Sequence, residues 1–179
     1  MSLAVRKAIE ADAAAIVRVG RASFYDTFVN LFTSHDELER YLNLTYNADR
    51  IQKSISKQNN SYFLALINEE VAGFAKIKKT SPHEVIKSEN QSELQRIYVL
   101  KEYHGCGAGQ GLLDAAIKEA QELETGQLWL DVHTSNEKAK RFYEKNGFSK
   151  AGNHTFTIGA QTFDYYVMAL PIKVSTYKI

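Results

Sequence analysis

SELQRIYVLKEYHGCGAGQGLL, residues 92–113, combines three patterns in succession. The β-branched and aromatic residues of Ile97-Tyr98-Val99 are typical of a strand. A loop with glycine at positions 105, 107, 109 and 111 follows, and apolar residues from Leu112 to Ala120 then recur at three- and four-residue spacing. The stretch therefore predicts a strand, a glycine-rich loop and a helix.

Such a loop favours a phosphate group as its ligand. Glycines expose the loop amides, and the start of the helix adds unpaired N–H groups and the positive end of its dipole. A Walker A loop would need Lys-Ser or Lys-Thr where Gln110-Gly111 stands, which argues against a nucleoside triphosphatase. A Rossmann loop would lie near the start of its domain, but Asp131 after the next strand keeps that interpretation open. A glycine turn without a ligand also stays open.

Length, charge and cysteine content limit the class of protein. We expect the 179 residues to form one domain, residues 1–179. The 22 basic and 21 acidic residues leave a formal charge of +1, which favours neither nucleic acid nor a membrane as partner. The single cysteine, Cys106, fits a reducing compartment, and without a signal peptide or a membrane-spanning run the expected location is cytoplasmic. The histidines and carboxylates lack a metal-ligand spacing such as HExxH, so we expect no metal site.

The hydrophobic periodicity predicts a first strand, a series of helices, three strands, a helix, a strand, a short helix and two closing strands. Expected strands cover residues 5–9, 61–67, 71–78, 92–100, 128–132, 148–158 and 162–170. Expected helices begin with residues 10–12, after residue 34, after residue 47, after residue 111 and at residue 136. The helix between residues 100 and 128 requires its two flanking strands to be parallel if it crosses over right-handedly.

Two motifs at this spacing resemble those of the Gcn5-related N-acetyltransferases. The segment His104-Gly105-Cys106-Gly107-Ala108-Gly109 is similar to the family's motif A, Gln/Arg-x-x-Gly-x-Gly/Ala. The segment NEKAKRFYEKNGF, residues 136–148, is similar to its motif Asn-x-x-Ala-x-x-Phe/Leu-Tyr-x-x-x-Gly-Phe. His104 departs from the family's Gln or Arg, but the resemblance covers essentially the whole chain.

The resemblance implies a fold and a cosubstrate. The fold is mixed α/β (α+β), with a central, mostly antiparallel sheet of six to seven strands that splays between its two middle strands and carries helices on both faces. The cosubstrate is acetyl-CoA, with its thioester in the V between those strands. The expected cofactor-binding residues are the strand backbone at Ile97, Tyr98 and Val99, the loop His104, Gly105, Cys106, Gly107, Ala108, Gly109 and Gln110, and Asn136 and Tyr143.

A proton donor and a proton acceptor are needed for acetyl transfer to an amine. Tyr143 is the expected general acid, because a phenol with a pKa of about 10 can protonate the leaving thiolate. Glu93 and Asp131 stand where branches of the family carry a base, and His133 shares its strand face with Asp131. A water chain could replace them, Tyr143 could be a core aromatic, and either carboxylate could be a surface residue.

Within the family the chain resembles the PaiA-type spermidine/spermine acetyltransferases. The similar stretches are residues 23–28, 40–47 and 73–78. A polyamine site requires carboxylates and flat aromatic rings, which Tyr25, Asp26, Glu37 and Tyr41 would supply. A solvated helix face is the alternative for each of these residues.

Three functions remain open at this stage. The first is an acetyl-CoA-dependent N-acetyltransferase that acts on a small-molecule amine, with a polyamine favoured. The second is a protein acetyltransferase that modifies an N-terminus or a lysine, and the third is a non-catalytic regulator that binds acyl-CoA. Members of this family often dimerise, and a homodimer stays open because no interface is visible in the sequence.

Overall fold

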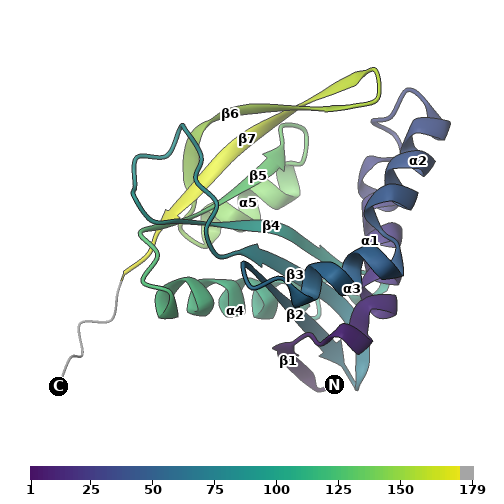
Figure 1. Ribbon diagram of the computed structural model, residues 1–179, viewed down its shortest axis with the longest axis horizontal. Helices are drawn as coiled ribbons and strands as arrows, with labels where there is room; N and C mark the ends of the chain where they lie inside the picture. Colours follow the sequence, from purple (N-terminus) through teal and green to yellow (C-terminus); the bar gives the residue numbers. More distant parts are fainter. Residues whose placement is uncertain (174–179) are drawn as a thin grey trace. The chain divides into compact units, whose positions relative to one another are not determined.

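Strands and helices follow one another along the protein in the order that its residue pattern predicts (Figure 1). The computed structural model describes residues 1–173. Within them lie the strands β1 (Leu3–Lys7), β2 (Asn60–Ile67), β3 (Glu70–Lys78), β4 (Gln91–Val99), β5 (Gln127–His133), β6 (Ser149–Ile158) and β7 (Gln161–Pro171), and the helices α1 (Ala13–Phe28), α2 (His35–Thr45), α3 (Ala48–Ser56), α4 (Ala108–Glu122) and α5 (Glu137–Lys145).

The strands form one hydrogen-bonded sheet in the order β1-β2-β3-β4-β5-β7-β6. The β4–β5 pair is parallel, as the crossover through α4 requires, and the pairs β1–β2, β5–β7 and β6–β7 are antiparallel. The sequence-based expectation of a mixed α/β, mostly antiparallel sheet is therefore confirmed. The β4–β5 register joins only three residue pairs and ends at Glu93 opposite Trp129.

The chain divides into two compact units. The N-terminal unit comprises Met1–Ile77 and Arg96–Ala116, and the C-terminal unit comprises Lys78–Gln95 and Ile117–Ile179. Both β4 and α4 cross from one unit to the other. The expected single domain over residues 1–179 stays a prediction.

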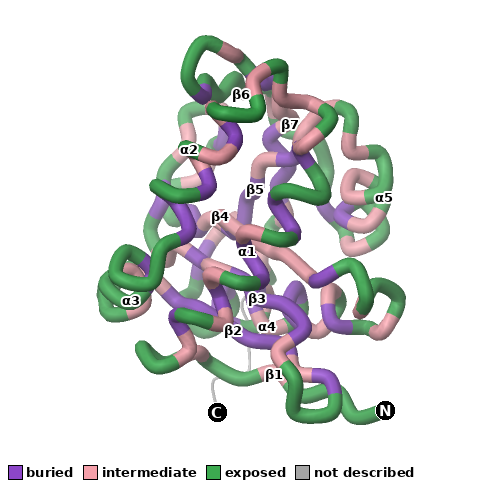
Figure 2. The backbone as a smooth tube through the Cα atoms, turned by 90° about the vertical axis from the view of Figure 1, so that its right-hand side faces the viewer, coloured by how far each residue is buried: buried purple, intermediate pink, exposed green. Residues whose placement is uncertain are grey.

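The N-terminal unit packs helices against both faces of its strands. One face of β2 and β3 joins α1, α2 and α3 in a core that contains Ile16, Phe24, Leu38, Leu42, Tyr46, Ile51, Tyr62, Leu64 and Phe74. On the other face α4 begins close to β1, since a Cβ at Gly111 would lie 3.0 Å from the side chain of Val5. Figure 2 shows the result, with buried residues along β2 and β3 and mostly exposed residues along α3.

The C-terminal unit covers both faces of β5. On one face the loop before β4 places Val85 and Ile86 against Trp129, Val167 and Ala169. On the other face α5 is followed by a tight turn at Gly147, where a Cβ would lie 3.2 Å from Leu170 of β7. Strand β6 pairs with β7 along its whole length but contains a register shift between Lys150 and Gly152.

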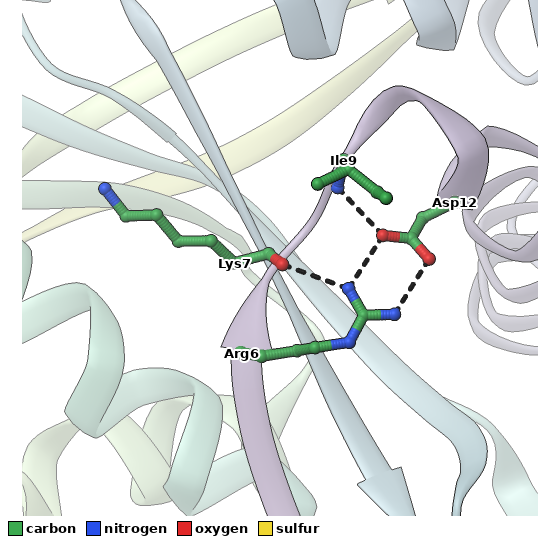
Figure 3. Close-up of polar contacts among 4 residues, drawn as sticks. All are labelled: Arg6, Lys7, Ile9 and Asp12. Carbon is green, nitrogen blue, oxygen red and sulfur yellow. Dashed lines mark hydrogen bonds and ion pairs between the residues drawn. The ribbon is translucent and has the colours of Figure 1, made fainter.

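Strand β1 begins and ends two residues earlier than the sequence predicts. Leu3 pairs with Ile67, and the ladder stops at Lys7 opposite Phe63. Figure 3 shows the cause: Asp12 accepts a hydrogen bond of 2.8 Å from the Ile9 N–H and two from the Arg6 guanidinium. The Ile9 amide therefore starts the turn into α1 and does not continue the strand.

The same contacts predict that Asp12 stabilises the fold most strongly above acidic pH. The Arg6 hydrogen bonds lower the pKa of Asp12, so its contribution is present above the unfolded-state pKa and is lost as the pH falls through the folded-state pKa. Asp12→Asn should lower the free energy of unfolding by about 1 kcal/mol at neutral pH, because Arg6 is 46% exposed and solvent screens the pair. Urea unfolding at pH 7 and pH 3 measures this. The difference between the two proteins should shrink at pH 3, and a constant difference would contradict the prediction.

Candidate active site

The glycine loop has the backbone geometry of an anion site. Gly105 and Gly107 adopt φ angles of +79° and +83°, which side chains other than glycine rarely adopt. No atom lies within 4 Å of a Cβ built at Gly105, so a side chain there would protrude into open space. The next residue after Gly107 begins α4, whose first-turn amides lack partners within the helix. The loop thus fits the pyrophosphate of a coenzyme.

Two residues of the loop hold the loop itself in place. The Cys106 amide donates to the Tyr103 carbonyl oxygen at 3.3 Å, so this amide is already hydrogen-bonded within the loop. The His104 ring nitrogen Nε2 donates to the Val99 carbonyl oxygen at 3.0 Å. His104 therefore fastens the loop to the end of β4, a role that the sequence motif does not reveal.

This geometry predicts that a substitution at Gly105 affects acetyl-CoA binding more than it affects the stability of the fold. Gly105→Ala should lower the free energy of unfolding by only about 1–2 kcal/mol, the cost of the left-handed backbone, because the new methyl group meets no neighbour. The same methyl group should weaken acetyl-CoA binding about tenfold, because it stands where the amides face the ligand. Calorimetric titration with acetyl-CoA and urea unfolding measure the two effects. Unchanged affinity would exclude the loop as the pyrophosphate site.

Tyr143 lies in the last turn of α5. The turn that follows this helix lies against Leu170 of β7, the strand partner of Leu128, so α5 lies on the side of β5 that carries Leu128. The Tyr143 side chain is 7% exposed and its ring lies 5.7 Å from that of Phe148. Asn136 caps this helix, since its Oδ1 accepts from the Ala139 N–H at 3.2 Å. The Asn136 amide nitrogen is left as the group of that side chain that can donate to a ligand.

The opposite side of β5 gathers acidic and imidazole side chains. Glu93 pairs with Trp129, and Asp131 and His133 follow Trp129 at a spacing of two, so these four side chains share one face, here called the carboxylate face. Ser81 Oγ donates to Glu93 at 2.8 Å. The structure therefore brings both candidate bases to one face of the sheet and leaves Tyr143 on the other.

Asp131 and His133 on the carboxylate face each have a hydrogen-bonding partner. His154 of β6 lies with its Nδ1 2.9 Å from Asp131 Oδ2, whereas Asp131 Oδ1 is buried with no hydrogen-bond partner among residues 1–173. His133 bonds Ser135 Oγ through Nδ1 at 2.7 Å, and burial lowers the pKa of His133. The sequence pattern singles out Asp131 and His133 but not His154.

The four expected acceptor residues differ in their surroundings. Asp26 is exposed and Tyr25 is 37% exposed, with its ring edge-on to His35 at 6.5 Å. Glu37 is half-buried in the first turn of α2, where its N–H donates to Ser34 Oγ. The Tyr41 ring lies 4.8 Å from Phe24 and belongs to the rim of the core. Tyr41 thus packs against the core of the N-terminal unit, and its contact with an acceptor stays a prediction.

A half-buried arginine, which sequence reasoning missed, lies in the N-terminal unit. Arg96 of β4 donates to the Tyr46 hydroxyl at 2.9 Å, and its guanidinium lies 5.3 Å from the centre of the Tyr46 ring. Burial raises the pKa of Tyr46 and of Tyr98, and these hydroxyls keep the pKa of Arg96 high although burial opposes its charge. Arg96 therefore anchors the C-terminal end of α2 to β4.

No three His, Cys, Asp or Glu side chains within residues 1–173 are grouped so that they could hold a metal ion. None of the helices in that range is both long enough and apolar enough to cross a membrane.

Comparison with known proteins agrees with this geometry. A family model described as "Acetyltransferase (GNAT) family" matches residues 22–148. An N-acetyltransferase of Lactobacillus delbrueckii is 29% identical over 150 residues, which cover 84% of this chain and 86% of the relative. A spermidine N(1)-acetyltransferase of Thermoplasma acidophilum is 26% identical over 152 residues, which cover 83% and 89%.

Solved structures show the same fold. The PaiA N-acetyltransferase of Thermoplasma acidophilum in complex with coenzyme A superimposes with a TM-score of 0.76 at 25% identity and covers 96% of this chain and 99% of that one. The ribosomal-protein-S18-alanine N-acetyltransferase of Escherichia coli reaches a TM-score of 0.71 at 20% identity, over 99% of each chain. The chain therefore belongs to the GNAT family and is an acetyl-CoA-dependent N-acetyltransferase.

Proposed function

We propose that this enzyme acetylates a primary amine of a small molecule and that a polyamine, spermidine or spermine, is its acceptor. The observation that carries the first part is the division of chemistry across β5, with Tyr143 on one side and Glu93 and Asp131 on the other. Tyr143 can then protonate the leaving sulfur, while a group on the opposite side of β5 removes a proton from the attacking amine.

The chain's own residues supply binding and proton transfer. Acetyl-CoA brings the acetyl group as a reactive thioester. The amides around Gly105 and Gly107 bind its pyrophosphate, and the Tyr143 hydroxyl donates a proton to the sulfur that leaves. A base on the carboxylate face takes a proton from the ammonium group of the acceptor, because a protonated amine has no lone pair with which to attack.

Two features support a polyamine as the acceptor. The Thermoplasma acidophilum relative carries the name spermidine N(1)-acetyltransferase and aligns with most of this chain. In the N-terminal unit, α1 and α2 present the carboxylates of Asp26, Asp36 and Glu37 at exposed or half-exposed positions. Several separated carboxylates are what a string of ammonium groups requires.

A panel of acceptors tests the proposal. Release of free thiol from acetyl-CoA is followed with spermidine, spermine, simple monoamines, amino acids and peptides with free N-termini. Saturable release with spermidine or spermine, and not with monoamines or peptides, would support the polyamine. The same assay on Asp26→Asn and Glu37→Gln should show a raised KM for spermidine and an unchanged kcat, because these residues bind charge away from the reacting atoms.

Other results would replace the proposal. Release with peptides alone would favour a protein acetyltransferase, the activity named for an Escherichia coli relative that is 34% identical over 89 residues, or 48% of this chain. Thermal stabilisation by acetyl-CoA with no release for any acceptor would favour a regulator that binds acyl-CoA.

A further inference from the structure

An extra residue in β6 brings His154 to the carboxylate face. Lys150 pairs with Met168, but Gly152 and not Ala151 pairs with Val167, so Ala151 is the additional residue of a bulge. Beyond the bulge His154 pairs with Tyr165, which in turn pairs with His133 of β5. Without the bulge every later side chain of β6 would point to the other face, because side chains alternate along a strand.

The contact with Asp131 determines which nitrogen of His154 is available. Nδ1 lies 2.9 Å from Asp131 Oδ2, and an ionised carboxylate can only accept, so Nδ1 carries the hydrogen. The neutral imidazole then has its lone pair on Nε2, which has no hydrogen-bond partner among the described residues. The His154 side chain is 38% exposed, so an acceptor molecule can reach it.

The other candidates on this face are already engaged. Glu93 accepts a hydrogen bond from Ser81, and Nδ1 of His133 accepts one from the Ser135 N–H at 3.2 Å, which uses the lone pair of its neutral ring. The Oδ2 atom of Asp131 is bonded to His154, and its Oδ1 atom is buried. His154 is therefore the group on the carboxylate face that combines an available lone pair with exposure.

We propose that His154 is the general base of acetyl transfer and that Asp131 is the residue that positions it. This inference rests on the proposed function and deepens it, since it names the atom that accepts the proton. The two residues form a carboxylate–histidine pair, in which the carboxylate holds the imidazole in one tautomer and stabilises the imidazolium that forms.

The proton and electron balance of the step is complete. An N–H bond of the acceptor ammonium breaks, and the proton moves to Nε2 of His154. The amine lone pair forms a C–N bond with the acetyl carbon while the C–S bond breaks, and the sulfur takes a proton from Tyr143. His154 then releases its proton to solvent. A second N–H bond breaks at the nitrogen that has formed the C–N bond, which leaves the neutral amide, and this proton restores the Tyr143 hydroxyl through solvent.

Kinetics of His154→Gln test the role. The glutamine amide can still donate to Asp131 but cannot take up a proton, so kcat/KM should fall about 10²-fold while the Kd of acetyl-CoA stays unchanged. The acidic limb of the kcat/KM profile, which reports a base that must be deprotonated, should disappear. Added imidazole should restore part of the activity.

A matched control separates this role from a general effect of removing an imidazole. His83 lies in the loop before β4, with its ring 5.5 Å from the His154 ring. His83→Gln should keep the activity and the acidic limb. The other titratable groups facing His154 are Asp131 and His133 of β5 and Tyr165 of β7, all of which remain in both variants.

Asp131→Asn tests the positioning. In the wild-type protein, ¹⁵N-histidine NMR should show His154 with its hydrogen on Nδ1; a hydrogen on Nε2 would overturn the proposal without any activity assay. Asp131→Asn should shift hydrogen to Nε2 and lower kcat/KM, and the double variant should be no slower than His154→Gln alone, because the two residues act as one unit.

The outcomes distinguish the two proposals. A wild-type enzyme that transfers acetyl to no amine in the panel would remove the proposed function and with it the role of His154 as base. A wild-type enzyme that is active, together with a His154→Gln variant that retains its rate and its acidic limb, would overturn the role of His154 alone.

Discussion

Tyr143→Phe is expected to lower turnover about 10²-fold or more while the affinity for acetyl-CoA barely changes. The variant removes one oxygen atom and keeps the ring that packs on Phe148 at 5.7 Å, so the fold of α5 should survive. The loss should appear equally in kcat and kcat/KM, because protonation of the leaving sulfur belongs to the transition state and not to binding. Steady-state kinetics and calorimetric titration with acetyl-CoA measure the two quantities.

Tyr166→Phe is the matched control for this variant. Tyr166 lies on β7 of the same unit, where the ammonium groups of Lys140 and Lys150 lie 5.0 and 4.4 Å from its ring. A phenylalanine ring keeps that cation–π contact, so removal of this hydroxyl should leave turnover unchanged. Undiminished turnover of Tyr143→Phe would remove Tyr143 from the mechanism.

Gly20→Ala is expected to destabilise the protein, although alanine is the better helix former. A Cβ at Gly20 of α1 would lie 2.3 Å from Cε1 of Tyr46, which is 1% exposed and bonded to Arg96. The ring cannot retreat without breaking that bond, so overpacking should cost about 3 kcal/mol against a gain of about 1 kcal/mol in helix propensity. The net loss of about 2 kcal/mol is measured by urea unfolding.

Gly109→Ala provides the comparison for Gly20. A Cβ at Gly109 of α4 would meet only the Val99 side chain, at an ordinary contact distance of 3.9 Å. This variant should therefore be as stable as the wild-type protein or slightly more stable. Combining Gly20→Ala with Tyr46→Leu should show a favourable coupling energy, because the smaller side chain makes room for the methyl group. Equal stability of Gly20→Ala and the wild-type protein would show that the ring moves aside.

Local patterns were sufficient to predict the elements. Ser34 caps α2 at the helix start that the sequence predicts, because a cap depends on residues three apart in the chain. The prediction for β1 was wrong by two residues at each end. The cause is the set of hydrogen bonds from Arg6 and Ile9 to Asp12, which alternation of apolar residues does not record.

The candidate site was only partly visible in the sequence. Glu93, Asp131 and His133 share a face because strand periodicity repeats every two residues, and Tyr143 is marked by its motif. The catalytic and binding roles of these residues stay predictions. His154 could not be found in this way, because one extra residue at Ala151 reverses the alternation of β6.

The sequence by itself determined the order of strands and helices, the parallel β4–β5 pair, the glycine loop and the family, since each depends on local spacing or on a short motif. Only the tertiary structure decided which distant groups meet: Tyr46 with Arg96, Gly20 with Tyr46, and Asp131 with His154. The physical reason is that these contacts join segments separated by many residues, and their geometry depends on strand register and helix packing. A linear sequence pattern specifies neither the strand register nor the helix packing.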